Sequence, residues 1–326
     1  MIKSLAEKML RTFGLEMIGT PKQQTQPLSG NTSSQTGWAA LVESLGKDPL
    51  NPNLHLQYAI EASKAGRSHL AYAELKTAEY LGARPEATKE LSKAFRQALP
   101  DPLSMNHNQY FRFISLSSEI VARAGGTNVS ILDVGGGDGR LASFIPEASY
   151  CLAEPTLNGI SGTDLPFADR SFDYVVSCHV LEHVPVNERT LFLDQTLAKA
   201  KRGVVLLNPF HVEGTYIDER LKLFIEITGA QWAKEHLDCT LPKVEDISSY
   251  ANNRGLQISI KPNGTLTTTM AFVFIDYFAA KAECYEDWKK VNVFFNEKYS
   301  DILDSPRYPN SYLIYLGRPE SPSTVS

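Results

Sequence analysis

The chain has 326 residues, of which 43% are hydrophobic and 10% aromatic, and a formal net charge of −5. This composition is that of an ordinary globular protein, and the length favours two structural units over one. The acidic balance argues against a nucleic-acid-binding surface, so we expect no nucleic acid partner. No run of about 18 apolar residues occurs, so we expect no transmembrane helix.

The first 37 residues predict a helix followed by a linker. Residues 1–18 space their apolar side chains as a helix does, with charged residues between them, which is not the pattern of a signal peptide. This helix is only weakly basic, so we expect it to be docked or frayed; contact of residues 2–14 with a membrane surface is the alternative. Residues 19–37 are rich in Gln, Ser, Thr, Gly and Pro and predict a flexible linker.

The cysteines favour a reducing compartment. Four are present, widely spaced, and none forms a C-x-x-C pair. We therefore expect free thiols and a cytoplasmic location rather than a disulfide or zinc framework. They are Cys151, Cys178, Cys239 and Cys284.

Residues 38–105 predict a helical region. Segments 54–66 and 68–83 each place apolar residues three and four apart, with Gly66 between them, and Pro85 begins a third helix. The first two helices resemble one tetratricopeptide-type hairpin. The positions that carry this resemblance are Gly66, Ala71, Leu75 and Ala78. Repeat arrays need several units, so a bundle that caps the next domain and a protein-interaction module both stay open.

Residues 106–320 predict an α/β domain. A helix is expected over 108–124, and from residue 130 short apolar strands alternate with other segments, which indicates a mainly parallel sheet. The expected strands are SILDV (130–134), YCLAE (150–154), FDYVVSC (172–178) and GVVLLNP (203–209), followed late in the chain by LQISIKP (256–262) and SYLIYLGRP (311–319).

The stretch ILDVGGGDGR, residues 131–140, carries the most specific motif. An apolar strand, an acid and a glycine-rich turn form the first half of a nucleotide-binding crossover, and we expect a helix to start near Arg140. The third glycine of the dinucleotide fingerprint G-x-G-x-x-G is replaced by Arg140, which disfavours a nicotinamide-dependent oxidoreductase.

The spacing D-x-G-x-G-x-G instead resembles motif I of the class I S-adenosylmethionine-dependent methyltransferases. Residues 162–185 are similar to the D-x-LPF-x-D-x-SFD…LEHV segment of one subfamily. The resemblance implies a Rossmann-like sheet of seven strands with an antiparallel last strand, and S-adenosylmethionine as cofactor. The residues that it places at the cofactor are Asp133, Gly135, Gly136, Gly137, Gly139, Glu154, Asp164, Leu165, Cys178 and His179.

Five of these positions have individual roles in the resemblance. Glu154 would accept hydrogen bonds from the ribose hydroxyls, Asp164 would accept from the adenine amino group, and Leu165 would pack on the ring. Cys178 and His179 would border the methionine part of the cofactor. One departure matters: Glu154 and Asp164 are ten residues apart, so the usual third strand does not fit and the sheet is expected to be shortened. The N-terminal helices are the candidate cover for the side that this leaves open.

The inserts 211–255 and 264–310 predict a lid over the substrate pocket. Both are rich in aromatic residues and follow strands of the sheet, where α/β enzymes bind substrates; a core or dimer role for these aromatics is the alternative. Residues 267–275, TTTMAFVFI, are compatible with a further strand.

Two histidines are candidate proton acceptors, because histidine titrates near neutral pH. They are His183, just past the fourth strand of the family pattern, and His211, which follows the next strand. Some relatives bind a divalent metal at this place, and here the set would be His179, Glu182, His183 and His211. We expect no metal, since the same short motif occurs in metal-free relatives.

The sequence therefore predicts a methyltransferase acting on an oxygen or nitrogen of a small molecule or glycan. The alternative is a methyltransferase-like, cofactor-binding scaffold without turnover, whose helical N-terminal region would bind a protein partner. The specificity for the acceptor is expected to be set by the inserts, where no motif is recognisable.

Overall fold

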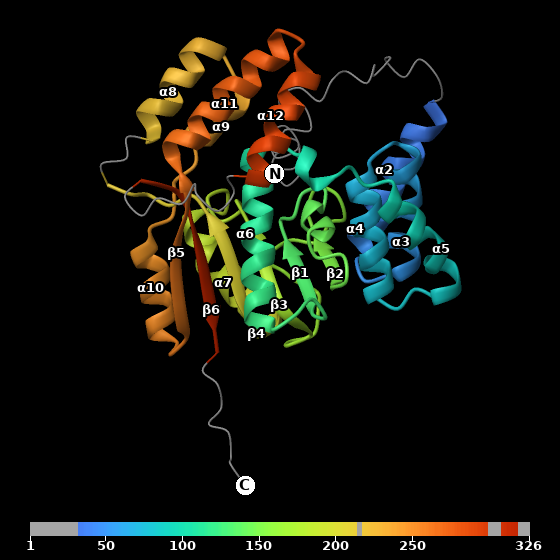
Figure 1. Ribbon diagram of the computed structural model, residues 1–326. Coiled ribbons are helices and arrows are strands. Elements are labelled where there is room, and N and C mark those ends of the chain that lie inside the picture. Colours follow the sequence, from blue (N-terminus) through green and yellow to red (C-terminus); the bar gives the residue numbers. More distant parts are fainter. Residues whose placement is uncertain (1–31, 214–216, 299–307, 319–326) are drawn as a thin grey trace.

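The chain folds around a six-stranded sheet with strand order β2-β1-β3-β4-β6-β5 (Figure 1). Strands β1 to β4 pair in parallel, and β6 runs antiparallel to both of its neighbours, β4 and β5. This computed structural model describes residues 32–213, 217–298 and 308–318. The strands are β1 (Ser130–Val134), β2 (Ser149–Ala153), β3 (Phe172–Cys178), β4 (Ala200–Asn208), β5 (Gln257–Thr265) and β6 (Pro309–Gly317).

The predicted α/β class and the antiparallel last strand are confirmed, and the sheet is shortened as the spacing implied. No strand lies between β2 and β3 in the described chain, so β2 is an edge strand. The helix expected after the glycine turn is wrong: a single 3₁₀ turn, Arg140–Ser143, stands there. Only about five further residues separate that turn from β2, which leaves no room for a crossover helix of ordinary length.

Helices cover both faces of the sheet. Helix α6 (His107–Ala124) lies on one face and α7 (Arg189–Lys199) on the other (Figure 1). Because successive strand residues point to opposite faces, neighbours in one strand join different cores. Val176 packs with the core that includes α6, whereas Val175 packs with the core that includes α7.

The N-terminal helices pack beside β2, at the sheet edge where a third strand would otherwise lie (Figure 1). Helix α4 is buried on all sides from Leu70 to Ala78, which is unusual for a surface helix. Its Thr77 hydroxyl accepts a hydrogen bond of 2.9 Å from the backbone N–H of Leu152 in β2. The helix thus covers the edge and satisfies one of its open backbone groups. These helices are α2 (Thr32–Lys47), α3 (Pro52–Lys64), α4 (Ser68–Tyr80) and α5 (Pro85–Gln97).

Local sequence sets the boundaries of these helices. The Asn51 side chain caps α3 by accepting from the N–H groups of Asn53 and Leu54, and Pro52 occupies the first turn. Helix α2 already begins at Thr32, so the end of the predicted 19–37 linker is helical. The predicted helix over 1–18 lies outside the described residues.

Helices α8, α9, α11 and α12 of the two inserts lie above the carboxyl ends of the parallel strands, whereas α10 lies beside β5 (Figure 1). The TTTMAFVFI segment belongs to helix α11, which corrects the strand alternative; the Thr265 side chain caps this helix at the Thr268 N–H. No helix in the described part of the chain is long and apolar enough to cross a membrane. The insert helices are α8 (Ile217–Thr228), α9 (Gln231–Leu237), α10 (Val244–Asn253), α11 (Leu266–Lys281) and α12 (Tyr285–Lys298).

Candidate functional site

The glycine turn lies at the carboxyl end of β1, and glycine is required at its positions for different structural reasons. Gly135, Gly137 and Gly139 all adopt positive φ angles, of 74°, 57° and 74°, which side chains other than glycine rarely tolerate. A Cβ atom on Gly135 would lie 2.3 Å from a methyl carbon of Val180. One on Gly136 would lie 2.4 Å from the Asp133 carboxylate. These two glycines therefore let the protein pack against itself.

Gly137 and Gly139 differ in what they face. A Cβ on Gly139 would lie 2.2 Å from the Cβ of Ala73, so this glycine lets helix α4 dock on the turn. A Cβ on Gly137 would meet no protein atom within 4 Å among the described residues. Gly137 is the one glycine of the turn whose missing side chain leaves room for a ligand rather than for protein.

The Glu154 carboxylate lies next to this open glycine. The Gly137 N–H donates to Glu154 Oε2 at 3.2 Å, and the Thr156 hydroxyl and N–H donate to Oε1. Burial raises the pKa of Glu154, and the three donors oppose that rise. The ends of β1 and β2 are thus brought together as the sequence predicted.

Asp133 supports the turn from beneath. Its carboxylate accepts a 2.6 Å hydrogen bond from the Tyr150 hydroxyl inside the core. Burial raises the pKa of Asp133 to about 7, even though the Tyr150 hydrogen bond acts in the opposite direction. At 2% exposure the Asp133 side chain braces the turn rather than forming part of its surface.

A buried polar chain connects Glu154 to the N-terminal helices. The Asn158 side chain accepts from the Glu154 N–H at 2.9 Å and donates to Glu74 of α4 at 3.0 Å. Glu74 in turn accepts from His55 of α3, with 2.5 Å between Nδ1 and Oε2. His55, Glu74 and Asn158 are each fully buried. The N-terminal helices therefore fix the backbone of Glu154, the residue whose carboxylate contacts Gly137.

The same helices present polar atoms without hydrogen-bond partners among the described residues. These atoms are the Tyr58 hydroxyl, one terminal nitrogen of Arg67 and Nδ1 of His69, all buried. The charges of Glu154 and Arg67 act on the pKa of Tyr58, and those of Asp138 and Arg140 on the pKa of His69, so both groups lie near the β1 and β2 ends. Buried polar atoms normally have partners, and this set is suited to binding a polar ligand.

Two further predicted cofactor residues, Asp164 and Leu165, differ in their exposure. Asp164 is exposed, and its backbone forms a small bridge with Ser161. Leu165 is only 3% exposed and packs in the core that includes Phe167 and Phe172. In this structure its side chain is a core side chain, since the LPF segment folds back onto the amino end of β3.

The carboxyl end of β3 carries a second polar group. His179 has a positive φ of 56°, which bends the chain away from the sheet directly after Cys178. Its Nδ1 lies 3.3 Å from Oε1 of Glu182, whose other oxygen accepts from the Asn208 amide at 2.6 Å. Burial lowers the pKa of His179 to about 4. Despite its own burial, the pKa of Glu182 is lowered to about 2 by the neighbouring histidines.

The neutral ring of His179 therefore lies beside an ionised carboxylate, but the 3.3 Å approach of Nδ1 to Glu182 Oε1 is not a hydrogen bond. Nε2 of His179 and Oε1 of Glu182 are both buried without a hydrogen-bond partner in the described chain. A neutral imidazole can accept a proton at its unprotonated nitrogen.

The four residues considered from sequence as a metal set are not brought together as a whole: His179 and Glu182 are in contact, but His211 is not part of the group. His211 is exposed, and its backbone pairs with the segment at Pro242 and Lys243. His183 instead lies beside His236 and Cys239 of the first insert, and these three are the group of potential metal ligands in the described chain. The sequence could not reveal this, because the partners are more than 50 residues away from His183.

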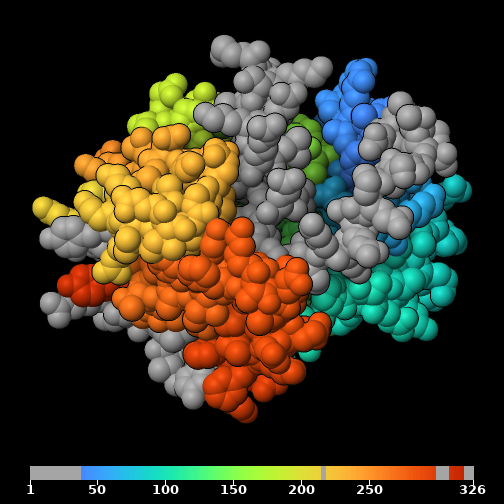
Figure 2. Space-filling model, turned by 90° about the horizontal axis from the view of Figure 1, so that it is seen from above, coloured from blue at the N-terminus to red at the C-terminus, as the bar shows by residue number. Residues whose placement is uncertain are grey.

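The described residues around the site belong to two sides of the molecule. Figure 2, seen from above, shows α8 and α11 with their neighbours on one side and the N-terminal helices on the other. Sequence analysis missed the contributions of Tyr58, Arg67, His69 and Glu74. The one available signal in the sequence was the short spacing after β2. It indicated that another segment covers this side of the sheet, but not which residues of that segment contribute.

Three solved structures illustrate what the fold is similar to. A putative methyltransferase from Bacillus halodurans is 14% identical with a TM-score of 0.37, over 63% of this chain and 99% of that one. Phosphoethanolamine N-methyltransferase 2 from Haemonchus contortus, in complex with phosphomonomethylethanolamine and S-adenosylhomocysteine, is 14% identical with a TM-score of 0.39, over 63% and 53%. A putative sarcosine dimethylglycine methyltransferase from Galdieria sulphuraria is 12% identical with a TM-score of 0.40, over 67% and 91%.

No curated protein matches the chain. A family profile described as a methyltransferase domain matches residues 87–259, which is more than half of the 326 residues. The matched range begins in α5, includes α6 and the whole parallel part of the sheet, and ends in β5. The chain belongs to this family of methyltransferase domains.

Proposed function

We propose that this protein transfers a methyl group from S-adenosylmethionine to an oxygen or nitrogen of a small molecule or glycan. The observation that carries the proposal is the contact between Gly137, which faces open space, and the buried carboxylate of Glu154. A nucleoside requires such a pair, because its ribose hydroxyls need a fixed acceptor and its atoms need close approach to the main chain.

The residues present fit that cofactor. Glu154 would accept from the ribose, Asp164 from the adenine amino group, and Cys178 and His179 would border the methionine part. The unpartnered atoms of Tyr58, Arg67 and His69 supply further donors from the helical side. When bound, the cofactor supplies an electrophilic methyl group on a cationic sulfur, and the protein aligns the acceptor and excludes water.

A side chain that accepts a proton would assist methyl transfer to a substrate atom that carries a weakly acidic proton. His183 and His211 are the predictions from sequence, and the structure adds His179. Its Nδ1 lies 3.3 Å from the Glu182 carboxylate, and its Nε2 has no hydrogen-bond partner among the described residues. The exposed position of His211 makes it the weakest of the three.

Replacing Glu154 by alanine is expected to weaken S-adenosylmethionine binding by about 1–3 kcal/mol, the size of lost hydrogen bonds to a charged acceptor. Isothermal calorimetry with the cofactor and with S-adenosylhomocysteine measures this. Asp169→Asn is the matched control, because this carboxylate is exposed and precedes the amino end of β3. Equal affinity of Glu154→Ala and the wild type would rule out the proposed ribose contact.

Gly137→Ala tests whether a ligand occupies the open space. The new methyl group projects toward the ligand and touches no described protein atom, so cofactor affinity is expected to fall more than tenfold. The positive φ costs about 1–2 kcal/mol of stability. Gly125→Ala is the control, because Gly125 has a φ of 74° and an equally open Cβ direction at the end of α6, away from the turn. Unchanged affinity in Gly137→Ala would contradict the assignment.

A scaffold without turnover is the second candidate, and the extent of α4 burial bears on it. Nine consecutive buried residues leave that helix little free surface, which favours a covering role over a tetratricopeptide-type interaction module. The likeness to the LPF–SFD–LEHV subfamily is proposed on sequence alone. Methyl release from the cofactor in the presence of amine and hydroxyl acceptors separates an enzyme from a scaffold.

A further inference from the structure

We propose that His183, His236 and Cys239 bind one zinc ion, which fastens the first insert to the carboxyl end of the sheet. Zinc is favoured by borderline-soft sites made of imidazole and thiolate. This site goes beyond the methyl-transfer proposal and does not depend on it.

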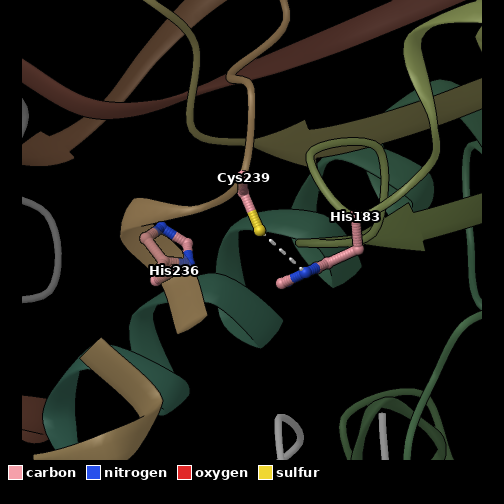
Figure 3. A group of neighbouring side chains, drawn as sticks. All are labelled: His183, His236 and Cys239. Carbon is pink, nitrogen blue, oxygen red and sulfur yellow. Dashed lines mark hydrogen bonds between the residues drawn. The ribbon is translucent and has the colours of Figure 1, made fainter. Parts of the chain in front are cut away.

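The three candidate ligand atoms lie close enough together to share one ion, and the Cys239–His183 pair is already near tetrahedral spacing. The ligand atoms of the three residues all lie within 4.8 Å of one another. Cys239 Sγ is 3.3 Å from Nδ1 of His183 (Figure 3). Zinc bonds of about 2.3 Å to sulfur and about 2.05 Å to nitrogen at a tetrahedral angle separate the two atoms by about 3.6 Å. Small side-chain rotations therefore convert the present contact into coordination.

The placement of the three residues would let one ion link the loop after β3 to the first insert. His183 lies in the loop that follows β3, whereas His236 is on α9 and Cys239 directly follows that helix, with the pair separated by three positions (Figure 3). The sheet end and the insert are thus joined by ligands from segments more than 50 residues apart. The three side chains are partly exposed, so water or an acceptor atom can reach a fourth position.

The charges around the cluster are mixed. The Arg112 guanidinium opposes a positive charge on His236, and the charge of Arg189 acts on Cys239 and Glu182. One carboxylate favours a cation. The buried Glu182 carboxylate interacts electrostatically with both His183 and His236. It is held by Asn208, so it stays beside the cluster without being one of the three ligands. Carboxylates next to histidine ligands commonly strengthen zinc binding. Coordination would occupy a ring nitrogen of His183 and so remove this residue as a proton acceptor.

Metal binding to the full chain tests the proposal without any assay of activity. The protein is stripped with a chelator and reloaded with Zn²⁺ or Co²⁺, and bound metal is counted by mass spectrometry. We expect one equivalent of zinc, and with cobalt a thiolate-to-metal charge-transfer band in the near ultraviolet. Cys239→Ser should abolish the band and lower zinc affinity more than tenfold, and His183→Ala should do the same to affinity.

Cys284→Ser is the matched control, because Cys284 is exposed and lies outside the cluster. It should bind metal as the wild type does. A wild type that takes up no more zinc than Cys239→Ser, or a cobalt band that survives in Cys239→Ser, overturns the proposal. Zinc should also raise the thermal midpoint of the wild type and of Cys284→Ser, but not that of Cys239→Ser. This readout separates a lost ligand from a misfolded variant, whose midpoint is already low without metal.

Discussion

Glu74→Ala is expected to destabilise the protein by about 3–5 kcal/mol, the cost of leaving one member of a buried ion pair without its partner. His55 donates from Nδ1 to Glu74 and from Nε2 to the carbonyl of Pro49 at 2.8 Å. Both partners are acceptors, so both ring nitrogens carry protons and the ring is an imidazolium. Neither His55 nor Glu74 has any exposed side-chain surface.

The pH dependence follows from the same pair. Burial lowers the pKa of His55, but the Glu74 charge and hydrogen bond outweigh burial, and the net result is a pKa above 6.5. The pair therefore contributes its full stability below pH 6.5, and that contribution is lost as pH rises through the folded-state pKa. Urea unfolding of the wild type should show this loss on the alkaline side, and Glu74→Ala should not.

Two control variants separate the charge from the packing. His55→Ala/Glu74→Ala should be less destabilised than the sum of the single variants, because the orphaned charge is gone. Glu61→Ala removes an exposed pair with Lys64 and should change the stability by less than about 1 kcal/mol. Additive effects of His55→Ala and Glu74→Ala, or a flat pH profile in the wild type, would show that the pair is not ionised.

Cofactor affinity provides a second readout of this variant. Glu74 holds Asn158, and Asn158 holds the backbone N–H of Glu154. A weaker affinity for S-adenosylmethionine in Glu74→Ala, measured where the protein is still folded, would show that the helices position Glu154, the proposed ribose acceptor.

The contrast between the sheet and its cover explains what could be predicted from the sequence. The mainly parallel sheet and the placement of Gly137 near Glu154 follow from local signals, because both residues stand just after strands whose carboxyl ends meet at one edge of the sheet. The roles of Gly135, Gly136 and Gly139 do not, because each depends on a protein neighbour distant in the chain or on the other side of the turn. A glycine motif shows that space is needed but not what fills it.

The differences between the expectations from sequence and the structure also result from contacts between distant segments. The predicted helix after the turn failed because the chain reaches β2 too soon, while α4 takes over the covering role from 60 residues upstream. The pairing of His183 with Cys239 rather than with His211 results from how the first insert folds back over the sheet. In both cases a tertiary contact, not a local pattern, decides the outcome.

Gly139→Ala is expected to be the most damaging single-methyl change in the turn, at about 2–5 kcal/mol. Its φ of 74° costs an L side chain about 1–2 kcal/mol, and the new Cβ would lie 2.2 Å from that of Ala73, which adds about 1–3 kcal/mol of overpacking. Both atoms belong to well-buried backbone segments, so neither can move aside cheaply. The helix would have to shift from the turn, and the cover of the cofactor site would shift with it.

Gly125→Ala isolates the backbone part of this cost, because Gly125 has the same φ of 74° and no atom near its Cβ direction. The difference in unfolding free energy between Gly139→Ala and Gly125→Ala is therefore the steric part. Ala73→Gly removes the opposing methyl group at a cost of about 1 kcal/mol in helix propensity. In the Gly139→Ala/Ala73→Gly double variant the steric part should disappear, so the two changes should be less than additive. If they are additive instead, helix α4 does not rest on the glycine turn, and the N-terminal helices are not the cover of this site.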